Sequence, residues 1–143
     1  MSYKFNPLSG QLDYYEEGGS ADDANRIEVT RKVDGVAVTK YDPVALITAT
    51  EVIPSNVDTL NNATVFGLAL EDAAIGQDVR ILIFGIVSDS FFTFPLNDPL
   101  FNSVSGAISA TATTIVGEFF CQIGKSNGLG SILVDPSKPT EVS

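Results

Sequence analysis

The fold of this chain is decided by one stretch of its sequence, Gly67-Leu-Ala-Leu-Glu-Asp-Ala-Ala-Ile-Gly-Gln-Asp-Val-Arg-Ile-Leu-Ile-Phe-Gly-Ile-Val87. Residues 63–70, which overlap its start, and residues 78–87, which form its end, are apolar runs of strand length. The connection between them is too short for more than one helical turn, and Gly76 permits a tight turn there. Gly67 lets another strand approach closely. The stretch therefore predicts two core strands that meet at a barrel corner.

The pattern of strands continues on both sides of this stretch. Residues 27–33 alternate between apolar and polar, and Asp34-Gly35 is a strong hairpin signal that predicts a partner strand at 36–40. Further strands are expected at 44–53, 115–123 and 131–134, with shorter ones near 90–94 and 107–112, and 55–62 reads as a polar loop. Glycine and proline recur every eight to twelve residues. We therefore expect an all-β domain, a small β-barrel or β-sandwich, over residues 26–135.

Length and charge limit the classes of function. The chain has 143 residues, of which 44% are hydrophobic and 18% charged, so we expect one compact domain. Its net charge of −10 repels phosphate backbones and anionic lipid, which argues against nucleic-acid and membrane partners. The longest apolar run, residues 81–87, is too short to span a membrane, and the first residues do not resemble a signal peptide. These features predict a protein used in a cytosol or in an assembly built there.

Catalytic and metal-binding patterns are missing from the sequence. It contains no histidine, so the usual general base and most metal sites are absent. The single cysteine, Cys121, lies among bulky apolar neighbours and reads as a small buried hydrophobe. Gly124-Lys125-Ser126 lacks the earlier glycine and the following helix of a phosphate-binding loop. Adjacent acidic pairs do not have the spacing of a calcium loop. We expect no enzyme activity, no cofactor and no metal.

The ends of the chain differ in character from the predicted domain. Residues 1–25 read as a docking arm and linker, because an apolar segment is followed by the acidic, glycine-containing stretch 16–25. The arm would present apolar anchors for a partner, and three residues would set its turn. The anchors are Tyr3, Phe5, Leu8, Leu12 and Tyr14, and the turn residues are Asn6, Pro7 and Gly10. The alternative is that the arm folds back as an extra strand. Residues 136–143 are expected to form a flexible tail.

An aromatic segment, residues 90–101, is richer in phenylalanine than a simple linker needs. Its phenylalanines are either part of the core or an exposed patch that requires a partner, such as an oligomer interface. The residues concerned are Phe91, Phe92, Phe94 and Phe101.

Two stretches resemble known proteins. Residues 67–87 resemble a segment that links two core strands in bacteriophage capsid-decoration (cement) proteins and related virion β-domains, and the similarity extends over 44–136. The start, Tyr3-Lys-Phe-Asn-Pro-Leu-Ser-Gly-Gln-Leu-Asp13, looks like a short N-terminal motif of phage structural proteins. The resemblance implies a virion structural protein, assembled in the host cytoplasm, that binds the major capsid protein or other virion proteins. It also implies a homo-oligomer, with a trimer favoured.

Two other functions compete with this interpretation. One is an anchoring module of a tail fibre, baseplate or head fibre, in which the arm grips the virion and the barrel supports a distal element. The other is a carbohydrate- or peptide-binding β-module unrelated to virions. The chain has no tryptophan, and three of its four tyrosines lie in the arm, which disfavours a lectin-like surface.

Overall fold

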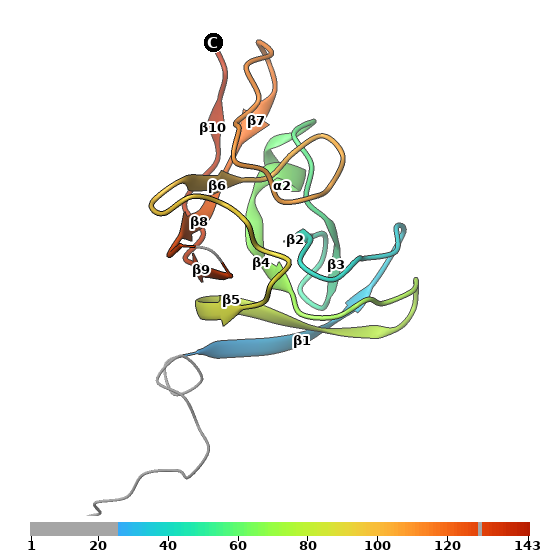
Figure 1. Ribbon diagram of the computed structural model, residues 1–143. Helices are drawn as coiled ribbons and strands as arrows, with labels where there is room; N and C mark the ends of the chain where they lie inside the picture. Colours follow the sequence, from blue (N-terminus) through green and yellow to red (C-terminus); the bar gives the residue numbers. More distant parts are fainter. Residues whose placement is uncertain (1–25, 129) are drawn as a thin grey trace, which may run out of the picture.

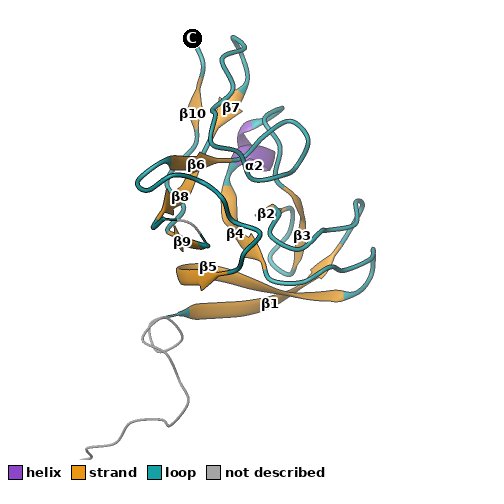
Figure 2. Cartoon of the chain, viewed as in Figure 1, coloured by secondary structure: helices purple, strands orange, loops and turns teal. Residues whose placement is uncertain are grey.

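The computed structural model describes residues 26–128 and 130–143, and this part of the chain is nearly all β, as predicted (Figure 1). One short helix, α2 (Leu60–Ala63), lies close to β7 (Figure 2). The strands are β1 (Ile27–Val33), β2 (Pro43–Leu46), β3 (Glu51–Pro54), β4 (Val65–Ala69), β5 (Asp78–Ser88), β6 (Pro99–Phe101), β7 (Phe119–Phe120), β8 (Gln122–Ser126), β9 (Ser131–Val134) and β10 (Thr140–Glu141).

Five strands close into a barrel in the order β1-β3-β2-β4-β5. The barrel closes because β5 pairs back onto β1 in antiparallel register, with Val29 opposite Ile81. A short parallel contact between β1 and β3, with Lys32 opposite Glu51, completes the ring. Of the two predicted architectures, the barrel is therefore the one that forms.

A second sheet grows from the same long strand. β5 has 11 residues, and its last part leaves the barrel to pair with β9, placing Gly85 opposite Val134. β8 and β6 follow in antiparallel order. β5 therefore joins the barrel and the second sheet into one unit.

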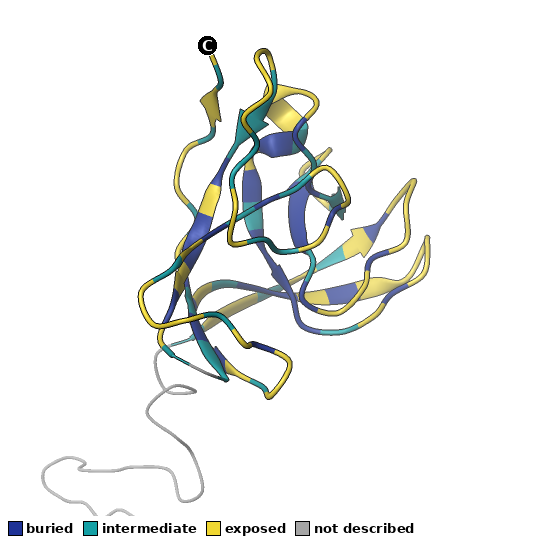
Figure 3. Ribbon diagram, turned by 45° about the horizontal axis from the view of Figure 1, so that its top comes forward, coloured by how far each residue is buried: buried dark blue, intermediate teal, exposed yellow. Residues whose placement is uncertain are grey.

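Alternating side chains on β4 and β5 divide the interior into two cores. Figure 3 marks the buried residues along the ribbon in dark blue. Ile81 and Ala69 point into the barrel, whereas Leu82 and Leu68 point toward the second sheet. The barrel core contains Val33, Val38, Val44, Val52, Ala69, Ala73, Val79 and Ile81. The core between the sheets contains Tyr41, Val65, Leu68, Leu70, Leu82, Val87, Phe92, Leu100, Cys121, Ile123, Ile132 and Val134.

The prediction that residues 27–33 and 36–40 pair as a hairpin around Asp34-Gly35 is wrong. Gly35 has a φ of 79° and turns the chain, but β1 pairs with β5 and β3 instead of residues 36–40. Val38 makes only an isolated bridge, with Ala73. The physical reason is that β1 closes the barrel when it pairs with β5, which buries more apolar surface than a local hairpin can.

Other predicted boundaries also differ from the structure. Residues 44–53, expected to form a single strand, form a hairpin of β2 and β3. The Ile47 N–H donates to the Glu51 carbonyl and closes the turn between them. The short strands expected near 90–94 and 107–112 do not form, and β6 lies between them. The segment 136–143, expected to be free, carries β10, which pairs with β7.

A tyrosine at the barrel edge ties the two sheets together. Tyr41 has a φ of 71°, unusual for a residue other than glycine, and its hydroxyl donates to the Asp89 carboxylate at the end of β5 (2.6 Å). Burial and this hydrogen bond raise the pKa of Tyr41 to about 12. The same bond, with the Phe91 backbone N–H, lowers the pKa of Asp89. The Lys40 ammonium lies 3.7 Å from Asp89.

The Tyr41–Asp89 bond predicts a specific pH dependence of stability. Because the pKa of Asp89 is lowered on folding, its contribution is present above the unfolded pKa of about 4 and is lost as the pH falls through the folded value. Tyr41→Phe keeps the ring but removes the bond, so it should lower the thermal midpoint at pH 7. The difference in thermal midpoint between the variant and the wild type should become smaller at acidic pH. In alkali, wild-type stability should fall as the pH rises from about 10 to about 12, and the variant should lack this loss. Equal thermal midpoints of the wild type and Tyr41→Phe at pH 7 would show that the Tyr41–Asp89 bond does not stabilise the fold.

β4 and β5 approach each other closely at Gly67. A Cβ atom at this position would lie 2.5 Å from the Leu82 carbonyl oxygen and 2.7 Å from Ile81 Cγ2. Gly67→Ala should therefore reduce the free energy of unfolding by about 3 kcal/mol, measured by chemical denaturation. Gly76→Ala is the matched control, since its added methyl meets nothing within 4 Å and only its φ of 88° is strained. It should cost about 1 kcal/mol. Equal losses would show that the two strands do not meet as described.

Candidate interaction surface

The predicted arm lies outside the described residues. This applies to all eight of its proposed contacts: Tyr3, Phe5, Asn6, Pro7, Leu8, Gly10, Leu12 and Tyr14. The described chain begins at Arg26, next to the start of β1 (Figure 1). Docking of the arm therefore stays a prediction.

The aromatic segment is used mostly inside the domain. Phe92 is 1% exposed and belongs to the core between the sheets, and Phe94 packs against that core. The Phe101 ring is half-buried and lies 5.9 Å from the ring of Phe120. Phe91 is 60% exposed. The four rings thus do not form one exposed patch, and Phe92 is not available for the oligomer interface that the sequence suggested.

An exposed apolar surface occurs instead in the segment that follows β6. Residues 99–117 contain no charged side chain and form the longest uncharged run of the chain. Val104 and Val116 are each 73% exposed, the highest values among the large apolar side chains described, and Ile115 is 61% exposed. Val104, Ala112 and Ile115 line a shallow depression of about 210 Å³. We call Val104, Ala112, Ile115 and Val116 the apical surface.

A buried asparagine anchors the base of the apical surface. The Asn102 side-chain oxygen accepts from the Cys121 backbone N–H (2.8 Å), and its amide donates to the Asn56 carbonyl (3.0 Å). Ser55, also fully buried, donates to the Asn62 carbonyl (2.8 Å). These bonds fix the segment that precedes α2, and the residue between β7 and β8, to the start of the uncharged segment.

Hydroxyl groups within this segment bond to the segment itself. Ser103 donates to the Ala107 carbonyl (2.6 Å), and Ser109 donates to the Thr111 carbonyl (3.0 Å). The Thr113 hydroxyl donates to the Glu118 carboxylate at the edge of the depression. With these hydroxyls used internally, the loop is ordered and its exposed face is mainly apolar.

The C-terminal segment supports the same end of the molecule. The Val142 N–H donates to the Glu118 carbonyl (2.9 Å), and the Gly117 N–H donates to the Val142 carbonyl (2.9 Å), so the β7–β10 ladder continues to the tip. The Cys121 thiol is buried and contacts the Ser137 carbonyl (3.1 Å), and burial raises its pKa. This environment agrees with the expected structural role of the cysteine. β7 and β10 project from the end of the molecule opposite β1 (Figure 1).

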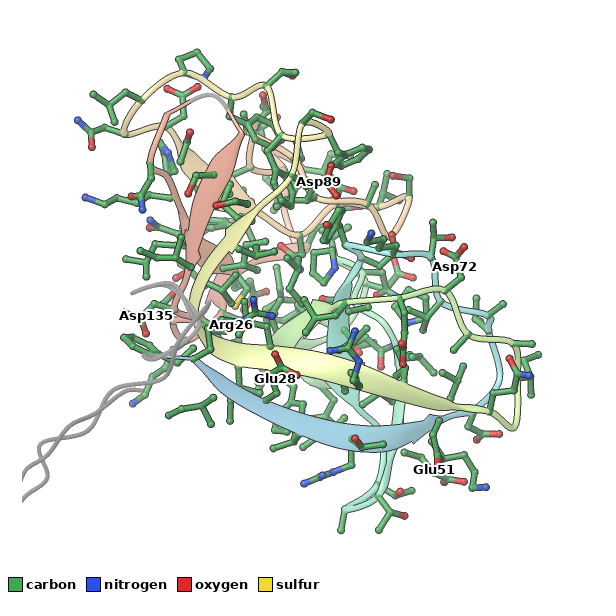
Figure 4. The ribbon with its side chains drawn as sticks, turned by 60° about the horizontal axis from the view of Figure 1, so that its bottom comes forward. Arg26, Glu28, Glu51, Asp72, Asp89 and Asp135 are labelled. Atoms are coloured by element: carbon green, nitrogen blue, oxygen red, sulfur yellow. The ribbon has the colours of Figure 1, made fainter. Side chains whose placement is uncertain are left out.

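Outside the apical surface, charged side chains either form ion pairs or are separated from one another. On the β1–β5 ribbon, Glu28 accepts from Arg26 (2.8 Å) and Arg80 (3.3 Å), and Arg80 also reaches Glu71 (3.4 Å). Figure 4 shows the acidic side chains Glu51, Asp72, Asp89 and Asp135 spread over the molecule. No group of three or more potential metal ligands occurs among the described residues. The described part of the chain also holds no helix with the length and apolar character that a membrane crossing needs.

The fold and this surface define an all-β domain, a closed barrel with an attached sheet, that presents an ordered apolar face. No family model matches the chain, and no curated protein matches it in sequence.

The Asn102 network predicts a large effect of one substitution. Asn102→Ala removes a buried side chain and leaves the Cys121 N–H and the Asn56 carbonyl without this partner, so stability should fall by about 2–3 kcal/mol. Asn61→Ala, at an exposed position of α2, is the control and should change stability by less than about 0.5 kcal/mol. Both values come from chemical denaturation. A loss at Asn102 no larger than at Asn61 would show that the network does not hold this end together.

Proposed function

We propose that this chain is a bacteriophage virion structural protein that decorates the assembled capsid. It binds the major capsid protein or other virion proteins by protein–protein contacts, performs no catalysis, uses no cofactor and resides in the virion. The resemblance of residues 67–87 to capsid-decoration proteins supports this proposal, as does the resemblance of residues 3–13 to the start of phage structural proteins.

One structural observation carries the proposal: the described domain completes its cores without the arm. The barrel is closed by pairing of β5 with β1, so it has no open edge that needs a further strand. Both cores are formed by side chains between Val33 and Val134. The described cores therefore do not need the apolar residues of the arm, which supports a role for these residues in binding another protein.

The arm and the barrel would act together as two linked contacts. Each apolar side chain of the arm contributes about 1.5–3 kcal/mol when it is buried against a partner. The linker 16–25 supplies reach, on the order of 3.3 Å per extended residue. Once the barrel is seated on the shell, the tethered arm has a high effective concentration, so modest contacts suffice for stable binding.

Deletion of residues 2–15 tests this role of the arm. If the arm docks on the virion, the truncated protein should keep the thermal midpoint of the full chain and lose binding to purified capsids. Binding is measured by co-sedimentation with particles that lack the protein. Gly76→Ala in the full-length chain is the control for a small loss of stability and should still bind. A truncated protein that unfolds, or that binds capsids as well as the full chain does, would contradict the proposal.

A further inference from the structure

We propose that the arm of one copy of this chain binds as an added strand along the open edge of β1 in a second copy. This role of β1 rests on the proposed function of the arm as a docking segment, and it names the surface that receives the arm. β1 is one of the two strands whose pairing closes the barrel, and it lies at the outside of the molecule (Figure 1).

One edge of β1 is open over most of its length. β5 pairs with β1 from Ile27 to Lys32, whereas β3 pairs with it only at Lys32 and Val33. Closure of the barrel therefore uses only the end of this second edge. The Val33 N–H donates to the Gln77 carbonyl, and the Lys32 N–H donates to the Thr50 carbonyl on the other side of the strand.

The backbone of Thr30 faces this open edge. Peptide groups alternate along a strand, so the Glu28 and Thr30 N–H groups point to the same side as the Lys32 N–H, away from β5. The Thr30 carbonyl accepts from the guanidinium of its neighbour Arg31 (2.9 Å), where an adjacent strand would supply a backbone N–H. A depression of about 500 Å³ lies beside the edge, lined by Thr30, Arg31, Lys32, Ala49, Thr50 and Asp78. An extended segment can therefore reach the edge and bond to it as a further strand.

Apolar side chains stand next to the open edge. Ile27 and Val29 are on the face of β1 that also carries the barrel-core residue Val33. Ile27 is 53% exposed, and Val29 is only partly buried where it packs against the barrel core. The Arg31 guanidinium lies 5.4 Å from the centroid of the Phe66 ring, which is also partly buried against that core. An added strand with apolar residues on one face would cover these side chains.

The arm is the segment whose sequence fits this edge. Tyr3 and Phe5 are two residues apart, as are Leu12 and Tyr14, so each pair would point to one face of an extended segment. Lys4 carries the only charge between Tyr3 and Leu12, and this charge is attracted to a copy whose net charge is −10. Contact between two folded domains of the same acidic chain lacks this attraction.

The linker favours a neighbouring copy over the arm's own domain. The described chain begins at Arg26, directly before β1, so a segment that folds back on its own β1 needs only a short turn. Residues 16–25 instead place ten residues there, four of them acidic: Glu16, Glu17, Asp22 and Asp23. A charged linker repels itself and extends, with a reach on the order of 3.3 Å per residue. This length lets the arm reach the same edge of a copy seated beside it.

Disulfide cross-linking of the full chain tests the inference. Gln11→Cys chains are mixed with tagged Thr30→Cys chains under mild oxidation, and the mixed dimer is measured by non-reducing gel electrophoresis. The mixed dimer should form at least about tenfold faster than the dimer of Gln11→Cys with tagged Ile75→Cys, because the bound arm has a high effective concentration at β1. Ile75 is the matched control, since it is 58% exposed and lies outside β1. The native Cys121 is buried and does not compete.

Proline at position 30 provides a second readout of the same contact. The mean mass of the wild type in sedimentation equilibrium should rise with concentration between about 10 and 500 µM. Thr30→Pro removes the N–H that faces the open edge and leaves the bonds to β5 in place, so it should weaken the association by at least about tenfold. Thr30→Val keeps the N–H and should stay within about twofold of the wild type. Thermal midpoints of both variants verify that they fold.

Three results would overturn the inference: equal cross-linking rates at positions 30 and 75, a wild type that stays monomeric, or equal association of Thr30→Pro and Thr30→Val. A chain that carries both Gln11→Cys and Thr30→Cys should give linked dimers and larger species. A product that is instead a cross-linked monomer would assign the edge to the chain's own arm and would also overturn the inference. Binding to capsids is a separate assay, so failure here with capsid binding retained rejects the exchange of arms and leaves the proposed function standing.

Discussion

The structure depends on one strand that is shared between two sheets. β5 is hydrogen-bonded to β1 and β4 in the barrel and to β9 beyond it. Successive side chains of β5, such as Ile81 and Leu82, therefore enter different cores. β4 approaches β5 closely at Gly67, where a Cβ atom would lie 2.5 Å from the Leu82 carbonyl oxygen. A side chain at that position would push apart the barrel wall on which both cores are built.

Local sequence signals found the strands but not always their partners. The strands at 63–70, 78–87 and 131–134 could be predicted because each is an apolar run bounded by turn residues. The partner of β1 could not, because Asp34-Gly35 favours a local hairpin, whereas pairing with β5, some fifty residues away, closes the barrel. The C-terminal strand was missed for a similar reason. β10 is a short polar segment with little intrinsic preference, and it is held only by its pairing with β7.

The candidate surface was harder to foresee than the fold. Phenylalanine is strongly apolar, so the aromatic segment is a candidate interface from the sequence, yet Phe92 fills the core between the sheets. Val104, Ile115 and Val116 lie in a loop of small and hydroxylated residues that looks unremarkable in sequence. The sequence feature that marks this surface is a run of nineteen residues without charge (99–117) in a chain of net charge −10. The Asn102 network, which joins segments distant in sequence, lies near the start of this run.

In the proposed role, this protein covers an assembled shell through repeated protein contacts. The number of copies per purified particle, measured by quantitative mass spectrometry against the major capsid protein, tests it most directly. Decoration predicts a fixed ratio to the capsid subunits, roughly hundreds of copies per particle, because the shell repeats the same binding site by symmetry. About a dozen copies would instead indicate a fibre or anchoring module at one vertex or tail. Absence from the particle would contradict a virion role altogether.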